Sequence, residues 1–365
     1  MAVLEIVDKM AILSHEAYLT ETYPQSEKAK VGKLFQVKTP FRMDAEAEAL
    51  ANWIRDGTDL SQSKVKKRKR RKNAADENPF QDEIDYLQQI YSDFCTQLKE
   101  RFFPGRPDEQ EIRENNRELR LYMKDALAEI DEKWNRFDAG DFLIPDNCHY
   151  SICDVNNITN EVDGGKFNII LMDPPWENKH VKRVKLSHSG YSMLDNNQIG
   201  RLPIDQLLSP DDGLVVIWCS DNTRHRDAVQ SWLLTWNLAL TAKWYWLKVT
   251  KYGELICDFS QHKNPYEVIF LATPLTSSND NLKNLPDNLV IISVPSGIHS
   301  HKPPLDALLQ RYLQSPSSTQ DSSCASGQKC KKLEIFAQYL QPNWVSVGNE
   351  ACKLNHRTLF TSKIT

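Results

Sequence analysis

The chain has 365 residues, a formal net charge of −4, 40% hydrophobic and 26% charged residues, which is ordinary for a soluble protein of about two domains. No apolar run approaches the ~18 residues that a membrane span needs. Glu5 and Asp8 interrupt the apolar N-terminus, so we expect neither a membrane partner nor a signal peptide. The eight cysteines form no CxxC pair and no zinc-like Cys–His spacing, so we expect free thiols inside the cell and no metal.

A basic block divides the first part of the chain. Residues 1–55 are expected to be an N-terminal region whose function the sequence does not indicate, and the chain before about residue 145 is expected to be mostly helical. Residues 56–79 form a predicted linker, in which the stretch 64–72, KVKKRKRRK, has eight basic residues in nine. Such a block is typical of a nuclear import signal that binds an import receptor, and the alternatives are a non-specific phosphate clamp and a solvated run. The import signal is favoured and predicts a nuclear protein, with the cytoplasm as a second location.

Two amphipathic helices are predicted within residues 80–144. Apolar residues repeat every three or four positions from Ile84 to Leu98 and again from Ile112 to Phe137, which is the spacing of helices with one buried stripe each. The stretch FFPGRP separates them, so we expect a helical hairpin. Neither stripe is long enough for a sustained heptad seam. Docking on the domain that follows is therefore favoured over a coiled-coil contact with a partner, and the chain is expected to be a monomer.

Short β-branched runs alternate with helical stretches from residue 145 to residue 355. The predicted strands are 167–172, 214–219, 243–249, 266–273, 288–294, 333–337 and 344–347. Continuous apolar strands alternating with helices indicate an α/β fold whose mostly parallel sheet is covered on both faces. The Ser-rich stretch 314–329 is predicted to be a surface loop, and residues 356–365 are predicted to be a C-terminal tail.

The first of these strands ends in Asp173, Pro174, Pro175 and Trp176. Ligands bind at the carboxyl ends of strands in open α/β sheets, so these four residues are the candidate catalytic site. Prolines cannot donate hydrogen bonds, and their carbonyls are expected to stay free as acceptors on a rigid, extended chain. Acceptors beside an aromatic ring suit a flat base with an amino group, and adenine offers both.

The expected chemistry acts on the N6 amine of adenine, which is a poor nucleophile because its lone pair is conjugated with the ring. Hydrogen bonds to the Asp173 carboxylate and the Pro174 carbonyl would favour sp³ character and aim the lone pair at an electrophile. Stacking on Trp176 would hold the base, at ~1–3 kcal/mol per stacked base. Orientation and preorganised electrostatics suffice for this chemistry, without a covalent nucleophile or a metal.

A strand followed by DPPW resembles the MT-A family of adenosine N6-methyltransferases. Within that family, the stretches KWYWLKVT, HKNPYEVIFL, SHKPP, LEIFAQYLQPNW and VGNE look like the branch called methyltransferase-like protein four. The resemblance covers about residues 145–355 and implies a permuted, class I, Rossmann-like methyltransferase fold that binds S-adenosylmethionine. It also implies methyl transfer to adenine in RNA, with 2′-O-methyladenosine of spliceosomal small nuclear RNA as the expected target.

The resemblance further implies a set of cofactor-binding residues. Asp154 is expected to bind the methionine amino group of the cofactor, with a helix cap as its alternative role, and Lys263 to pair with the cofactor carboxylate unless it is an ordinary exposed lysine. An acid that commonly binds ribose hydroxyls corresponds to Glu350. Gln338 and Tyr339 depart from the family pattern, so no role is assigned to them. The expected cofactor-binding residues are Asp154, Val155, Asp173, Lys263, Glu334, Phe336, Asn349 and Glu350.

Other residues are expected to bind the nucleic acid. The basic loop after the DPPW turn would meet the phosphates that flank a flipped adenine, and a solvated loop is the alternative. Trp246 resembles a family residue that faces the base pocket, whereas the neighbouring tryptophans are expected to pack in the core. His225 is expected on a solvated helix. The expected substrate-binding residues are Lys179, Lys182, Arg183, Lys185, Tyr191, Trp246, His301 and Lys302.

Alternative functions remain open on the sequence. DNA is the alternative nucleic acid, because these residues do not distinguish it from RNA. A catalytically inactive scaffold of the same family would typically lose the acid-Pro-Pro turn, which this chain keeps. A protein that only binds nucleic acid would not need the cofactor-type residues. An active RNA methyltransferase is therefore the favoured interpretation.

Overall fold

The computed structural model describes residues 2–23, 31–42, 46–47, 50, 78–134, 138–162, 164–176, 195–259, 264–298, 300–313 and 330–360. Its strands are β1 (Val3–Val7), β2 (Met10–Leu13), β3 (His149–Ile152), β4 (Ile169–Met172), β5 (Leu214–Cys219), β6 (Leu238–Lys248), β7 (Tyr266–Pro274), β8 (Val290–Ser293), β9 (Lys332–Ile335) and β10 (Val345–Gly348). Its α-helices are α1 (His15–Thr22), α4 (Gln81–Gln97), α5 (Lys99–Phe102), α6 (Glu109–Glu114), α7 (Arg117–Lys133), α8 (Ile158–Glu161), α10 (Asn196–Gly200), α11 (Ile204–Leu207), α12 (Thr223–Thr235), α13 (Asp280–Lys283) and α14 (Asp306–Leu313). Its short 3-10 helices are η1 (Gly32–Phe35), η4 (Ala139–Asp141), η5 (Val155–Asn157), η6 (Lys353–Asn355) and η7 (Arg357–Leu359). The basic block 64–72 and the loop 177–194 lie outside the described residues.

The described strands form one sheet, in the order β1-β2-β8-β6-β7-β5-β4-β9-β10-β3. β4 pairs in parallel with β5 and β9, β10 with β9 and β3, and β8 with β6 and β2. β7 runs antiparallel between β5 and β6, and β1 is antiparallel to β2. The predicted α/β fold with a mostly parallel sheet is therefore confirmed.

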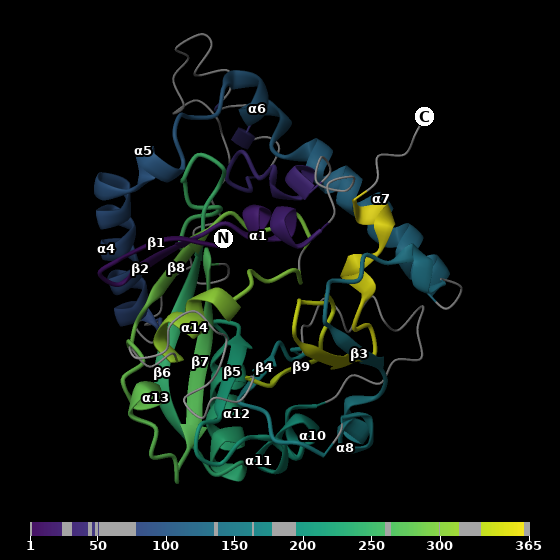
Figure 1. Cartoon of the computed structure of the whole chain (residues 1–365). Helices are drawn as coiled ribbons and strands as arrows, with labels where there is room; N and C mark the ends of the chain where they lie inside the picture. Colours follow the sequence, from purple (N-terminus) through teal and green to yellow (C-terminus); the bar gives the residue numbers. More distant parts are fainter. Residues whose placement is uncertain are drawn as a thin grey trace.

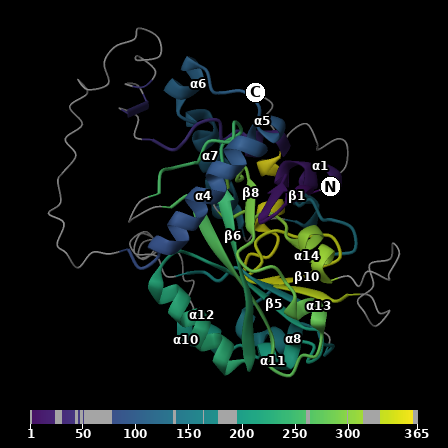
Figure 2. The same ribbon diagram turned by 90° about the vertical axis from the view of Figure 1, so that its left-hand side faces the viewer.

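Helices cover both faces of this sheet (Figure 1 and Figure 2). Successive side chains of a strand point to opposite faces, and every residue of β4 and β5 is buried. On one face Ile170 of β4 belongs to the same apolar cluster as Phe94 of α4 and Trp232 of α12. On the other face Ile169 belongs to a cluster with Leu308 of α14. No helix of the described residues is long and apolar enough to cross a membrane.

The described residues before β3 are mostly helical, as expected, but they begin with two strands. β1 and β2 form a hairpin, and β2 pairs in parallel with β8, with Met10 opposite Val290. Ala11 and Ile12 are fully buried, so the hairpin extends the central sheet. The sequence did not predict these two strands, because a short apolar run is compatible with a buried helix and with a buried strand.

The two long helices of residues 80–144 do not form a hairpin packed on itself. They lie at opposite sides of the molecule in Figure 1, with the short helices α5 and α6 between them in the chain. Leu87 and Phe94 of α4 belong to the core of the sheet. Met123 and Ile130 of α7 belong to a separate cluster with η1 and the C-terminal segment. The apolar stripes indicated one buried face for each helix, but a stripe does not specify the surface that covers it.

Candidate active site

The DPPW turn stands at the carboxyl end of β4, in the interior of the sheet. β5, β4, β9, β10 and β3 run side by side and in parallel, so their carboxyl ends meet at one edge, where ligands bind in such sheets. That edge carries Asp173 after β4, Phe336 after β9, Asn349 after β10 and Asp154 after β3. The fold therefore brings predicted catalytic and cofactor-binding residues from distant parts of the sequence to a common edge.

Asp173 lies at the end of a chain of alternating charges. Its Oδ2 atom is 3.8 Å from Nζ of Lys302, which also forms an ion pair with Glu267 of β7. Glu267 in turn pairs with Lys248, the last residue of β6. The exposed fractions of these side chains are 11–26%. At this degree of burial ion pairs are only weakly screened by salt.

Burial raises the pKa of Asp173 to about 6, against the opposing attraction of Lys302. Burial acts in the same direction on Glu267, but Lys248 and Lys302 outweigh it and hold the pKa of Glu267 below its ordinary value. Burial would lower the pKa of Lys302, but Asp173 and Glu267 raise it. The site therefore holds a charged lysine between two carboxyl groups, and the charge of Asp173 changes near pH 6.

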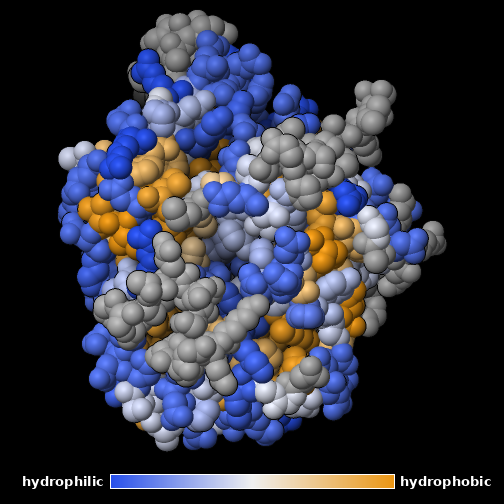
Figure 3. Space-filling view, in the orientation of Figure 1, coloured by the Kyte–Doolittle hydropathy of each residue, from blue (hydrophilic) through white to orange (hydrophobic). Residues whose placement is uncertain are grey.

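A small pocket opens beside Asp173. Glu334 of β9 is buried there, and burial raises its pKa to about 8 although Gln341 donates a hydrogen bond to it at 3.1 Å. Burial therefore favours the neutral, protonated form of Glu334. Figure 3 shows polar and apolar side chains gathered around a hollow at the centre of one face of the molecule. The pocket is lined by Leu171, Asp173, Trp218, Ser300, Lys302, Glu334, Phe336, Gln338 and Tyr339.

The turn after β9 brings its backbone unusually close to β10. Phe336 adopts a left-handed conformation, with φ at 66°, which costs about 1–2 kcal/mol for a residue with a Cβ atom. A Cβ atom at Gly348 would lie 2.9 Å from the carbonyl oxygen of Ala337, so glycine is needed there for this approach. Tyr339, further along the turn, donates a hydrogen bond from its hydroxyl to the carbonyl of Lys302 at 2.9 Å. The turn thus connects the predicted cofactor edge with the lysine beside Asp173.

Trp176 packs against α12. Its ring stacks on His225, with ring centroids 4.6 Å apart, and on Trp232 at 5.4 Å, and its indole N–H donates to the Trp218 carbonyl at 3.2 Å. His225 is buried and lies 2.6 Å from the Ser220 hydroxyl, so the expectation of a solvated His225 was wrong because Trp176 covers it. Base stacking on Trp176 stays a prediction, limited to the ring surface that α12 leaves uncovered.

The two prolines differ in their surroundings. Pro174 is buried and Pro175 is exposed. The Pro174 carbonyl accepts a hydrogen bond from the Trp176 backbone N–H at 2.7 Å, which corrects the expectation of a free acceptor. A carbonyl oxygen has two lone pairs, so one acceptor position remains for a ligand.

The predicted cofactor-binding residues that follow β3 and β10 lie at the surface of the edge or just beneath it. Asp154 is exposed, and its carboxylate accepts from the Asn156 N–H at 2.9 Å, which caps η5, while Val155 is buried. Glu350 pairs with Lys353 at 2.8 Å. Asn349 is half-buried, and Lys263 lies outside the described residues. Their contacts with a cofactor remain predictions.

The structure describes three of the eight predicted substrate-binding residues. Trp246 is 3% exposed and donates to the Ser293 hydroxyl at 2.8 Å, and His301 is 2% exposed between other rings. Neither residue lines the pocket beside Asp173, and their contact with a substrate stays a prediction. Lys302 reaches the pocket beside Asp173. The remaining predicted residues, Lys179, Lys182, Arg183, Lys185 and Tyr191, lie outside the described residues.

Lys248 and Glu267 belong to the site but were absent from the prediction. A signal for both was present, because Glu267 stands inside the mostly apolar strand β7 and Lys248 follows four buried residues at the end of β6. Such residues are almost never buried without a partner and often mark functional sites. Tyr339 was noted only as a departure from the family pattern, and its hydrogen bond to Lys302 now gives it a structural role.

Comparisons with known proteins agree with this architecture. Residues 167–350, half of the chain, match the family described as MT-A70. The chain is 37% identical over 229 residues to "N(6)-adenine-specific methyltransferase METTL4" of Mus musculus, which covers 60% of this chain and 45% of that protein. It is 31% identical to "DNA N6-methyl methyltransferase" of Caenorhabditis elegans, over 62% of this chain and 58% of the relative. It is also 31% identical to "N6-methyladenosine RNA methyltransferase MTA1" of Pyricularia oryzae, over 53% and 49%.

The match with METTL4 supports the branch that the sequence resembles. The chain spans about half the length of the curated relatives it matches. The family match, the Rossmann-like sheet and the DPPW turn at the end of β4 lead to one conclusion: the chain belongs to the MT-A70 family.

Proposed function

We propose that this chain is an S-adenosylmethionine-dependent methyltransferase that acts on the N6 amine of adenine in a nucleic acid. The observation that carries the proposal is the position of Asp173, a largely buried carboxyl group 3.8 Å from Lys302 at a strand end. This strand end shares one sheet edge with the residues expected to hold the cofactor. The family membership and the names of the similar proteins support the same reaction.

The cofactor, when bound, would supply a methyl group on a positively charged sulfur, and loss of that methyl group would leave it as a neutral thioether. Asp173 would accept one N–H of the adenine amine, and the remaining lone pair of the Pro174 carbonyl would accept the other. These two bonds orient the nitrogen lone pair for attack, and orientation of this kind lowers the barrier without a covalent intermediate. The nitrogen becomes acidic as it gains the methyl group and must lose a proton. Asp173, with its pKa raised to about 6, is a suitable acceptor for that proton.

The residues of the sheet edge fit this cofactor. The exposed carboxylate of Asp154 suits a cationic amino group, and the acid Glu350 suits ribose hydroxyls. The glycine at position 348 lets the turn that begins at Phe336 lie close to β10, and such close backbone approaches are common at ligand sites. Asn349 follows directly and adds an amide that can both donate and accept.

RNA is the substrate that we propose, with 2′-O-methyladenosine in spliceosomal small nuclear RNA as the target and the nucleus as the location. The resemblance to the methyltransferase-like protein four branch supports this choice, as does the RNA methyltransferase named for Pyricularia oryzae. The relative from Caenorhabditis elegans is named for DNA. DNA is therefore the alternative substrate that the experiment has to compare.

The test measures methylated nucleosides by mass spectrometry after incubation with matched RNA and DNA oligonucleotides, and with RNA that carries 2′-O-methyladenosine. We expect N6 methylation, strongest on the 2′-O-methylated RNA. Asp173→Asn and Asp173→Ala should lower the rate by ~10²–10³, by analogy with the loss of one preorganised hydrogen bond in a transition state. Asp280→Asn is the matched control, because that aspartate is 86% exposed and distant in sequence.

Retention of more than about a tenth of the wild-type rate by both Asp173 variants would contradict the role of Asp173, given that expected loss. Calorimetry with S-adenosylmethionine separates the remaining functions. Cofactor binding without any methylation would indicate an inactive scaffold, and nucleic-acid binding without cofactor binding would indicate a simple binding protein.

A further inference from the structure

The loop between β8 and α14 carries Lys302 to Asp173, and its described residues contain no helix or strand. Lys302 is held at its tip by the ion pairs with Glu267 and Asp173. The loop has some hydrogen bonds of its own, such as that between His301 Nδ1 and the Ser296 hydroxyl at 3.3 Å, and neighbouring elements supply the rest of its support. The elements that hold this loop therefore determine where the Lys302 ammonium lies.

The N-terminal segment, meaning the described residues between 2 and 42, supplies much of that support. β2 pairs with β8, the strand that leads into the loop. The backbone N–H of Gly297, within the loop, donates to the carbonyl of Leu34 in η1 at 2.6 Å. On its other side, a Cβ atom at Gly297 would lie 2.8 Å from Leu119 of α7. The loop is thus enclosed between the N-terminal segment and α7.

His15, the first residue of α1, contacts His301, the residue before Lys302. Its ring meets the ring of His301 edge-on, with centroids 4.4 Å apart, and lies 5.1 Å from the ring of Phe35. His301 also meets Tyr339 at 4.6 Å, and Tyr339 bonds to the Lys302 carbonyl. His15 and His301 are each 2% exposed. Neither ring nitrogen of His15 has a hydrogen-bond partner among the described residues, so its contact with the loop is one of ring packing.

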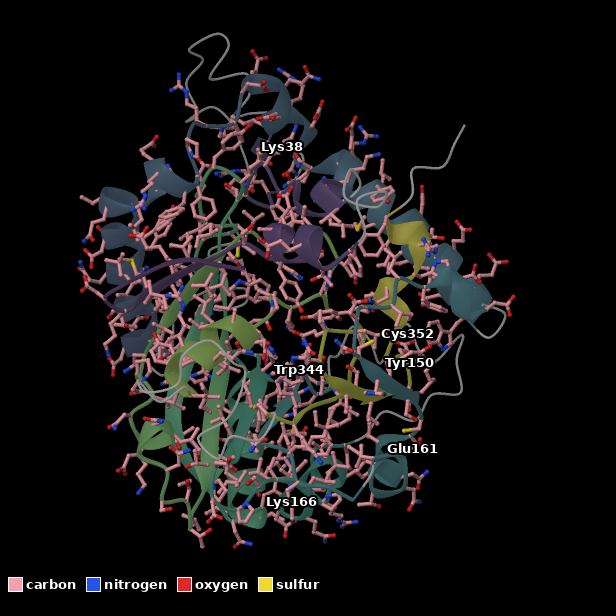
Figure 4. All side chains as sticks on the ribbon, in the orientation of Figure 1. Lys38, Tyr150, Glu161, Lys166, Trp344 and Cys352 are labelled. Atoms are coloured by element: carbon pink, nitrogen blue, oxygen red, sulfur yellow. The ribbon has the colours of Figure 1, made fainter. Side chains whose placement is uncertain are left out.

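The N-terminal segment is itself fixed from outside the loop. Lys38, labelled at the top of Figure 4, pairs with Glu111 of α6 at 2.9 Å. The side chain of Asn116, at the start of α7, accepts from the backbone N–H of Lys38 and of Thr39. The hydroxyl of Tyr23 accepts from Asn355 near the C-terminus. His15 therefore projects toward the loop from an anchored support.

We propose that His15 is a positioning residue for the methyl-transfer site: its ring holds His301, and thereby keeps Lys302 beside Asp173. The inference rests on the proposed function for its activity readout only. It assigns a role to the N-terminal segment, which lies outside the matched family region of residues 167–350.

The first test compares the rates of His15→Ala, His15→Phe and Tyr23→Phe. Displacement of an orienting group by about 1 Å can lower a rate by ~10²-fold, so His15→Ala should lower kcat by between ~10- and ~100-fold. His15→Phe keeps a ring in the cluster and should retain more than half of kcat. Tyr23→Phe is the matched control, because it removes a buried hydrogen bond of the same segment to Asn355 and should leave kcat within about twofold.

The acid limb of the pH–rate profile distinguishes positioning from a general loss of stability. Lys302 lowers the pKa of Asp173, Glu267 raises it, and Lys248 lowers it. If Lys302 withdraws, the pKa of Asp173 rises and the acid limb moves to higher pH. We expect this shift in His15→Ala and not in Tyr23→Phe. An unshifted limb in His15→Ala, or equal losses in His15→Ala and His15→Phe, would overturn the proposal.

Hydrogen exchange gives a readout that does not depend on activity. The peptide that contains residues 294–305 should exchange faster in His15→Ala than in the wild-type protein, since the Gly297 N–H loses part of its support. It should stay unchanged in His15→Phe and Tyr23→Phe. Unchanged exchange in His15→Ala contradicts the inference. Faster exchange in His15→Ala, combined with a wild-type protein that methylates nothing, would contradict the proposed function and leave the structural inference intact.

Discussion

Glu267 interrupts the mostly apolar strand β7, and Lys248 ends β6 after four buried residues. A largely buried charge in such a position is stable only with a partner. These two residues pair with one another, and Glu267 also pairs with Lys302. Removal of Glu267 would take away the carboxylate that pairs with Lys248, and removal of Lys302 would take away the ammonium beside Asp173. Their position indicates that they set the electrostatic surroundings of Asp173 and not merely the stability of the sheet.

The acid limb of the reaction should follow the charge of Asp173. A protonated Asp173 loses its strength as an acceptor, so methyl transfer should fall as the pH drops through about 6. Lys302→Met removes an attraction that lowers this pKa and should move the limb to higher pH. Glu267→Gln removes a repulsion that raises it and should move the limb to lower pH. Rates of kcat/KM from pH 5 to 8 test both shifts, since kcat/KM reports the pKa values of the free enzyme. Two shifts in the same direction would contradict this account.

At the same scale, the sequence predicted some residues of the site and misplaced others. Asp173 could be predicted because it directly ends an apolar strand, and the end of a strand specifies which edge a residue occupies. The burial of His301 and Trp246 could not be predicted, because it depends on packing partners far away in the sequence, such as His15 and Ser293. A local motif contains no information about such partners.

At the scale of secondary structure, long apolar runs predicted their strands well, as β5 illustrates: the predicted and observed bounds are both 214–219. β3 was missed because its sequence, HYSI, is mostly exposed at the edge of the sheet. An edge strand with few buried residues gives no alternating or continuous apolar signal. The hairpin β1-β2 was missed for the opposite reason, since its apolar residues suited a helix equally well.

The predicted cofactor edge depends directly on the close contact between β10 and the turn after β9. Gly348→Ala would place a Cβ atom 2.9 Å from the carbonyl oxygen and 3.0 Å from the nitrogen of Ala337. Backbone atoms must then shift, which typically costs about 1–3 kcal/mol. We expect a lower melting temperature and at least tenfold weaker S-adenosylmethionine binding by calorimetry.

Gly164→Ala is the matched control for this substitution, because a Cβ atom there would meet nothing within 4 Å. That variant should keep its cofactor affinity and be neutral or slightly stabilised, by roughly 0.4–1 kcal/mol. Wild-type affinity in Gly348→Ala would show that the close approach at this turn does not serve the cofactor.

At the scale of the whole molecule, elements from outside the matched family region complete the sheet and the site. β2 adds to the sheet beside β8, and η1 and α7 enclose the loop that carries Lys302. Amphipathic patterns indicated that α4 and α7 would bury a face, yet these helices cover different cores. The pattern of a single element cannot predict its partner, because most apolar surfaces are chemically alike and the choice depends on shape and connectivity.

The basic block 64–72 is proposed to serve nuclear import and not the fold. It lies in the stretch between η1 and α4 and outside the described residues, and it carries eight basic residues in nine. A tagged protein that lacks residues 64–72 should move from the nucleus to the cytoplasm. Its rate on short oligonucleotides should stay within a few-fold of wild type, because the residues at the sheet edge are intact.

Deletion of residues 315–323 is the matched control, since it removes nine residues of a polar, Ser-rich stretch without a basic block and should leave the protein in the nucleus. The alternative role of the basic block, a phosphate clamp, predicts a different result for the same deletion. If the block clamps phosphates, its deletion should weaken RNA binding and flatten the salt dependence by about 0.7 in log–log slope per lost single-strand contact. If the protein stays in the nucleus after the deletion and the salt dependence of RNA binding becomes flatter, the block is a phosphate clamp and not an import signal.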